Sequence, residues 1–276
     1  MKLKVDDIEF NLLLNETNLN QAKTPVVFLH GFTGDSTDWQ FIFDQLPDTL
    51  LPVAIDLIGH GKTDSHPNPV NYTCTAIVHQ LDSIFAQLNF RKIILAGYSM
   101  GGRAALSYCL KYPQHVSAAI LESTTAGIED FCLKKERVEL DLLFADKIKK
   151  EGVESFINYW FDTPLFKSLR NLPNFEAIKN KRNKNSVTGL SNSLMSFSTG
   201  LMMSYWDKLP SLNFPILLIS GESDTKYTEI NKAMRLKLPN ARHDTISQCG
   251  HNVHLEKPEL FTKLVIDFLT THERPS

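Results

Sequence analysis

IILAGYSMGGRAALSYCL, residues 93–110, joins a short apolar run to a long helical pattern through a glycine-rich turn. The spacing predicts a buried strand over Ile93–Gly97 and a buried helix over Met100–Tyr112. Between them lies a G-x-S-x-G motif, in which the glycines on either side of Ser99 let the backbone turn sharply without Cβ clashes. The Ser99 hydroxyl then lies at the positive end of the helix. The stretch therefore predicts an α/β fold with a reactive serine.

Short apolar runs alternate with helical patterns along most of the chain, which indicates βαβ units and a mostly parallel sheet flanked by helices. The other predicted strands are Val26–His30, Val53–Leu57, Val116–Glu122, Pro215–Gly221 and Arg242–Ile246, and the other predicted helices are Asp38–Leu46, Tyr72–Leu88, Thr228–Leu238 and Pro258–Thr270. Residues 128–209 show helical patterns without a strand. We therefore predict an α/β core over residues 1–127 and 210–276. Residues 128–209 would form an inserted helical cap over the carboxyl edge of the sheet, where such folds bind ligands.

Composition excludes several classes of protein. The 276 residues include 29 Lys and Arg and 31 Asp and Glu, a formal net charge of −2. This balance excludes a broadly basic nucleic-acid-binding protein, and we interpret the basic segment Asn180–Asn185 as a solvated turn. No run of 18 apolar residues is present, so we expect no membrane-spanning helix. Asp6, Asp7 and Glu9 interrupt any signal-peptide core, and four widely spaced cysteines favour reduced thiols, so we expect a cytoplasmic protein.

A serine needs a partner imidazole, and the best-placed of the nine histidines is His251. It follows the predicted strand Arg242–Ile246 and therefore lies at the carboxyl edge of the sheet, within reach of Ser99. His254, three residues on, is its competitor. We expect His30 and His60 to shape the loops that follow the first two predicted strands.

The imidazole in turn needs an acid to orient it. Asp224 follows the strand Pro215–Gly221 and is the preferred acid, while Glu122, at the end of another strand, is the runner-up. Glu222 lies closer to its strand and is expected to cap the loop. For the oxyanion, the predicted donors are the backbone N–H groups of Met100 and Phe32, which follow the serine and the first predicted strand.

Other chemistries have no support in the sequence. Gly59–Thr63 resembles the end of a phosphate-binding loop, but Asp56 stands where its first glycine should be. His251 and His254 have no third ligand nearby in the sequence. We predict neither a metal nor a cofactor.

Over nearly its whole length the chain resembles the α/β-hydrolase superfamily, in FLHGFTGD, IDLIGHGKT, GYSMGG, GESD and CGHNVHLEKP. The Ser99, Asp224, His251 order matches that superfamily. More narrowly, the chain resembles the 2-succinyl-6-hydroxy-2,4-cyclohexadiene-1-carboxylate synthase family of menaquinone biosynthesis. The specific segments are HGFTGDSTDW at 30–39, GYSMGGRAAL at 97–106, ILESTTAGI at 120–128, Glu136-Arg137, Trp160 with PLF at 164–166, and Ser198-Thr199-Gly200 with Trp206.

The resemblance implies a cofactor-free lyase that eliminates pyruvate from 2-succinyl-5-enolpyruvyl-6-hydroxy-3-cyclohexene-1-carboxylate. It implies that Ser99, activated by His251 and Asp224, acts as a base without forming an acyl-enzyme. The amides of Phe32 and Met100 would hold the developing anionic oxygen.

Four residues are candidates for binding this small polycarboxylate. Arg103 lies in a nearly apolar helix, and a buried guanidinium is costly unless an anion meets it. That anion is either a substrate carboxylate or an internal ion-pair partner. Arg137 either binds substrate, as the resemblance implies, or belongs to a solvated charged face. Tyr98 either donates a hydrogen bond to substrate or simply packs, and Trp160 is either pocket wall or cap core.

The sequence departs from the family at Ile58, Met195 and Ser198. The family often has proline in place of Ile58, arginine in place of Met195 and glycine in place of Ser198. Because one arginine is missing, we do not expect carboxylate recognition identical to that of the family. Two rival functions remain. One is a serine hydrolase of an ester, thioester or carbon–carbon bond with Ser99 as nucleophile, and the other is a catalytically silent binding protein. A trapped acyl-Ser99 would identify the first, whereas an intact triad argues against the second.

Overall fold

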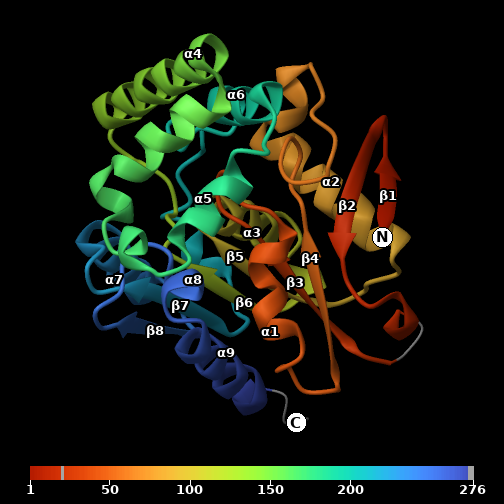
Figure 1. The fold of residues 1–276 in the computed structure, drawn as a ribbon. Helices are drawn as coiled ribbons and strands as arrows, with labels where there is room; N and C mark the ends of the chain where they lie inside the picture. Colours follow the sequence, from red (N-terminus) through yellow and green to blue (C-terminus); the bar gives the residue numbers. More distant parts are fainter. Residues whose placement is uncertain (20–21, 273–276) are drawn as a thin grey trace.

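The strands form one mixed sheet in the computed structural model, which describes residues 1–19 and 22–272 (Figure 1). The eight strands in these residues are β1 (Lys2–Val5), β2 (Ile8–Leu13), β3 (Thr24–Leu29), β4 (Leu50–Ile55), β5 (Ile93–Tyr98), β6 (Val116–Glu122), β7 (Ile216–Gly221) and β8 (Ala241–Ile246). Their order is β1-β2-β4-β3-β5-β6-β7-β8. The strands from β4 to β8 run parallel, and β1 and β2 join antiparallel at one edge. The expected α/β fold is confirmed.

Helices cover both faces of this sheet. They are α1 (Gln40–Phe43), α2 (Cys74–Gln87), α3 (Met100–Lys111), α4 (Phe131–Asp162), α5 (Phe175–Arg182), α6 (Val187–Ser196), α7 (Thr225–Lys237), α8 (Val253–Glu256) and α9 (Pro258–His272). Side chains of α2, α3 and α7 join one core cluster with one face of the strands. Those of α1 and α9 join a second cluster on the opposite face. Because parallel strands are buried on both faces, they appear in the sequence as continuous apolar runs.

The helices α4, α5 and α6 fill the connection between β6 and β7 and gather over one end of the sheet, in green to teal in Figure 1. The chain of α4 turns at Gly152, whose φ of 84° lies in the left-handed region that favours glycine. Residues of α4 and α6, including Phe156 and Leu190, form a separate hydrophobic cluster. This helical layer places side chains directly above the carboxyl ends of the strands.

Two predicted elements differ in extent from the structure. A helix over Asp38–Leu46 is wrong, since a 3₁₀ turn at Ser36–Trp39 leads into the four-residue α1. The Asp35 side chain caps that turn, and Pro47 disfavours helical backbone at the residue before it. The strand predicted over Val53–Leu57 instead spans Leu50–Ile55. It tolerates a proline because β2 pairs only with its last two residues.

No helix in the described part of the chain is long and apolar enough to cross a membrane. All four cysteines are free, as the spacing predicted.

Candidate active site

Ser99 lies on a strained turn between β5 and α3. Its φ is 49° and its ψ is −104°, a conformation that few non-glycine residues adopt. A Cβ on Gly101 would lie 2.2 Å from the carbonyl oxygen of Leu29, and one on Gly97 would lie 2.5 Å from that of Gly101. The two glycines therefore allow the backbone to pass closely enough to hold the serine at the end of its strand.

The structure brings together the three residues of the expected triad. His251 Nε2 lies 3.0 Å from Ser99 Oγ, and His251 Nδ1 lies 2.5 Å from Asp224 Oδ2. His251 is 2% exposed and Asp224 is 8% exposed. Asp224 also caps α7, because its side chain accepts the N–H of Tyr227. Nδ1–H can thus donate to the acid while Nε2 accepts from the serine, the arrangement that prepares a hydroxyl for proton transfer.

Glu122 and His254, the alternative acid and base, form a pair with each other and not with Ser99. His254 Nδ1 lies 2.8 Å from a carboxylate oxygen of Glu122, and its imidazole stacks on Trp39 with ring centroids 4.2 Å apart. The backbone N–H of His254 also donates to Glu122. This buried pair fixes the turn that carries His251. The pair therefore has a structural role beside the triad. Glu222 accepts from the backbone of Gln248, so it links neighbouring loops.

Two further histidines shape the loops around the pocket. His30 Nδ1 donates to the carbonyl of Gly31, and its Nε2 accepts the N–H of Leu57. Burial lowers the pKa of His30, so its ring is neutral at pH 7. His60 Nδ1 donates to the Ile58 carbonyl, and burial lowers the pKa of His60 to about 3. His30 thus links the loops after β3 and β4 by a hydrogen bond, and the His60 ring packs against His30 and Phe32 with ring centres 5.1 and 5.8 Å apart.

Arg103 lines the pocket next to Ser99 with no carboxylate within ion-pairing distance among the described residues. It is 8% exposed, its Nη1 donates to the Phe197 carbonyl at 2.6 Å, and its guanidinium lies 4.4 Å from the centre of the Phe197 ring. Burial, followed by the nearby Arg137, lowers the pKa of Arg103 to about 10, which leaves it charged at pH 7. Within the part of the chain that the structure describes, Arg103 therefore lacks the internal ion pair considered from sequence, and its cation lines the pocket.

Arg137 lines the same pocket from α4 rather than a solvated face. Its Nε donates to Asp141 Oδ2 at 2.8 Å, one turn further along the helix. Burial opposes the charged form of Arg137, but Asp141 outweighs it and raises the pKa. Two guanidinium groups therefore approach the triad from the sheet side and from the cap side.

Tyr98 and Trp160 both line the pocket and both pack. The Tyr98 ring centre lies 5.3 Å from that of His251 and 4.8 Å from that of His254, and burial raises the pKa of Tyr98 well above its usual value. Trp160 joins an aromatic cluster with Phe32, 5.7 Å between ring centres. Phe32 and Met100, whose amides are the candidate oxyanion donors, line the pocket beside Ser99.

The departures from the family pattern fall at different distances from this pocket. Ser198 lines it, and its hydroxyl accepts the N–H of Gly200. Met195 instead packs with the cap cluster and contacts Lys149, outside the residues that line the pocket. Ile58 is buried in the core.

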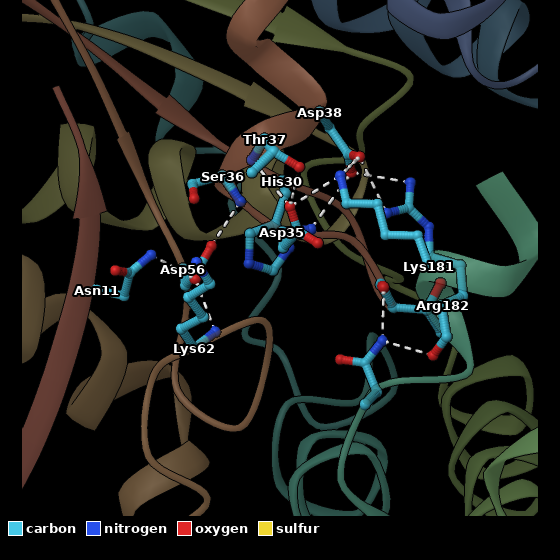
Figure 2. A network of polar contacts seen from close by, with 12 residues as sticks. Asn11, His30, Asp35, Ser36, Thr37, Asp38, Asp56, Lys62, Lys181 and Arg182 are labelled. Carbon is cyan, nitrogen blue, oxygen red and sulfur yellow. Dashed lines mark hydrogen bonds and ion pairs between the residues drawn. The ribbon is translucent and has the colours of Figure 1, made fainter. Parts of the chain in front are cut away.

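The interpretation of Asn180–Asn185 as a solvated turn is wrong. Arg182, at the end of α5, is buried and makes a two-pronged ion pair with Asp38, with distances of 2.9 and 2.8 Å (Figure 2). Lys181 bridges Asp38 and Asp35, and Asn185 donates to the Thr33 carbonyl. The side chains of Lys181 and Arg182 point into the protein because Asp35 and Asp38, in the loop after β3, neutralise their charges. That loop also carries Phe32, so the contacts tie the cap to it.

The loop that resembled a phosphate site has another role. Figure 2 shows Asp56 held by Asn11, by the backbone of Ser36 and by the backbone of Lys62. Gly61 has a φ of 56° and closes over this carboxylate. Within the described residues, no cluster of three or more His, Cys, Asp or Glu side chains could hold a metal ion.

Comparison with known proteins places this chain in a family. The alpha/beta hydrolase fold family matches residues 24–258. A Bacillus subtilis protein, provisionally named 2-succinyl-6-hydroxy-2,4-cyclohexadiene-1-carboxylate synthase, is 42% identical over 91% of this chain and 92% of its own. The chain belongs to this synthase family, within the α/β-hydrolase fold. An Enterobacter protein with the same name is 30% identical over 84% of this chain and 86% of its own. MenH from S. aureus has a TM-score of 0.89 and 32% identity, covering 96% and 99% of the two chains.

Two titratable residues in the pocket of this synthase-family member were missed from sequence. Tyr227 lies with its ring 4.6 Å from that of His251, and Asp141 lies beside Arg137. Tyr227 follows Asp224 by three residues, one helical turn, and Asp141 follows Arg137 by four. Helical spacing from an already chosen residue would have been the signal for both.

Proposed function

We propose that this chain is a 2-succinyl-6-hydroxy-2,4-cyclohexadiene-1-carboxylate synthase, a cytoplasmic lyase of menaquinone biosynthesis. The observation that carries the proposal is Arg103, a buried cation next to the Ser99 triad with no carboxylate within ion-pairing distance among the described residues. A small polycarboxylate would complete that environment. Membership of the synthase family supports the same substrate.

The reaction is a 1,4-elimination. The C2–H bond of 2-succinyl-5-enolpyruvyl-6-hydroxy-3-cyclohexene-1-carboxylate breaks, and its electrons form the C2=C3 bond. The C3=C4 electrons move to C4=C5, and the C5–O bond breaks to release enolpyruvate. Protonation of enolpyruvate gives pyruvate, and the ring remains as the 2,4-diene.

The triad supplies the proton transfers. His251 takes the hydroxyl proton of Ser99 at Nε2, and Ser99 Oγ takes the C2 proton, which is acidic because the succinyl ketone is adjacent. Asp224 stabilises the resulting imidazolium through Nδ1–H. His251 then returns its proton to the departing enolpyruvate, so the enzyme ends the cycle as it began. The N–H groups of Phe32 and Met100 stabilise the enolate oxygen of the ketone.

The cations position the substrate for this transfer. Arg103 and Arg137 bind carboxylates from opposite sides, with Arg103 fixed by Phe197 and Arg137 by Asp141. Tyr98 and Trp160 form walls that exclude water from the ring. Ser99 then meets the C2 proton and not a carbonyl carbon, which separates this activity from ester hydrolysis.

The test is the release of pyruvate by purified protein from the enolpyruvyl substrate, with the diene measured in parallel. One pyruvate per diene is the expected result, and p-nitrophenyl esters should turn over slowly or not at all. Fast ester turnover without pyruvate would instead identify a serine hydrolase.

A further inference from the structure

Asp141 is a buried carboxylate in a pocket that otherwise has a cationic character. It is 1% exposed, and among the described residues that line the pocket it alone carries an acidic side chain. It forms an ion pair with Arg137 and lines the same pocket as Arg103. A negative charge at this place disfavours a polycarboxylate, so its presence needs a reason.

The hydrogen bond to Arg137 uses only one of the two oxygens of the Asp141 carboxylate. Oδ2 accepts the Arg137 Nε at 2.8 Å, whereas Oδ1 is buried without a hydrogen-bond partner among the described residues. A buried acceptor left unpaired is costly, and a charged one more so. The free oxygen therefore calls for a donor from a molecule in the pocket.

The substrate of the proposed function offers one such donor. Its three carboxylates, its ketone and its ether oxygen accept hydrogen bonds at neutral pH, and none of them donates. The hydroxyl at C6 is the single O–H donor. It stands on the ring carbon next to the one that carries the C1 carboxylate.

We infer that Asp141 is a specificity-determining residue that accepts the C6 hydroxyl of the substrate through Oδ1, an inference that rests on the proposed function. Arg137 makes no other protein hydrogen bond among the described residues, so its terminal nitrogens serve the neighbouring C1 carboxylate. The two side chains, one turn apart on α4, together recognise a hydroxyl and a carboxylate on adjacent carbons. Asp141 also disfavours any substrate orientation that brings a carboxylate next to it, because the two negative charges repel each other.

The experiment compares kcat/KM for the natural substrate with that for its 6-deoxy analogue. Wild-type protein should prefer the hydroxylated substrate by about ten- to a hundred-fold, the effect of one hydrogen bond to a charged group. In Asp141→Asn, the amide oxygen must face Arg137, which only donates, so an NH₂ group replaces Oδ1. The preference should then fall at least about five-fold. In Asp141→Ala it should approach unity.

Asp146→Asn is the matched control, because Asp146 lies on α4 in an exposed pair with Lys150. It should keep the wild-type preference. If Asp141 only positions Arg137, both substrates lose rate equally in both variants and the preference is unchanged, which overturns the inference. If wild-type protein releases no pyruvate from either substrate, the proposed function fails and this inference falls with it.

Discussion

Arg103 stays charged although it is buried, and its contacts with the protein replace only part of the hydration that its guanidinium loses. A backbone carbonyl and an aromatic ring face it, and its pKa of about 10 reflects the lost hydration. An isolated buried cation is retained where an anion meets it during function. The residue is therefore a direct probe of substrate charge.

Arg103→Ala should lower kcat/KM for the enolpyruvyl substrate by about ten- to a hundred-fold, equivalent to about 1.5–3 kcal/mol for a charged hydrogen bond. Steady-state pyruvate release measures it. The exposed Arg235→Ala on α7 serves as the control and should leave kcat/KM unchanged. Equal kinetics for Arg103→Ala and wild type would remove the physical argument for an anionic substrate.

At the scale of elements, the contact between α5 and the loop after β3 joins the cap to the site. Burial alone would raise the pKa of Asp38, but Arg182 and Lys181 hold it well below its usual range. Removing one member of such a pair leaves the other charge buried and unpaired. The loop carries the amide of Phe32, so loosening this contact should affect catalysis as well as stability.

Asp38→Asn should lower the free energy of unfolding by about 3–5 kcal/mol, measured by urea titration. The double variant Asp38→Leu with Arg182→Met should recover much of that loss, because no charge is left unpaired. Glu229→Gln, which breaks an exposed pair with Lys232, should change stability by less than about 1 kcal/mol. If Asp38→Asn changes the free energy of unfolding as little as Glu229→Gln does, the ion pair between Asp38 and Arg182 does not stabilise the protein.

Sequence periodicity predicts the parallel strands, the strained serine turn and the residues that meet there, because each depends on local pattern. It does not predict the antiparallel β1–β2 edge or the inward turn of Arg182. The inward turn of Arg182 depends on Asp38, which is separated from it by 144 residues. The β1–β2 edge is a local hairpin in which Val5 pairs with Ile8, but its place in the sheet depends on the pairing of β2 with the distant β4. Asp141 and Tyr227 were missed because their one signal, helical spacing from Arg137 and Asp224, does not by itself show which side of the helix faces the pocket.

At the scale of the whole molecule, a formal net charge of −2 gives no long-range attraction for a polycarboxylate. Under the proposed function, affinity for the substrate then rests on a few cations placed inside the pocket. The fold also holds neutral histidines in its interior, and these make the stability of the entire chain depend on pH.

The unfolded chain binds a proton at His60 near pH 6.5. The native ring, whose buried Nε2 has no hydrogen-bond partner among the described residues, does so only near pH 3. Between these values the unfolded state holds more protons, so the free energy of unfolding falls as the pH falls. For His60 alone the loss from pH 7 to pH 5 is about 1–2 kcal/mol. His60→Asn, which retains a donor for the Ile58 carbonyl, should reduce the loss by that amount, measured by urea titration at both pH values. The exposed His79→Asn should leave the loss unchanged, and a His60→Asn loss equal to wild type would contradict the account.

The central claim is that Ser99 acts as a base in an elimination and not as a nucleophile. It is tested most directly by quenching the protein during turnover of the enolpyruvyl substrate and measuring both released pyruvate and intact protein mass. Pyruvate should accumulate while the mass stays that of the unmodified chain, and Ser99→Ala and His251→Ala should each lower the rate at least about 100-fold. An adduct on Ser99, or full activity in Ser99→Ala, would contradict the claim.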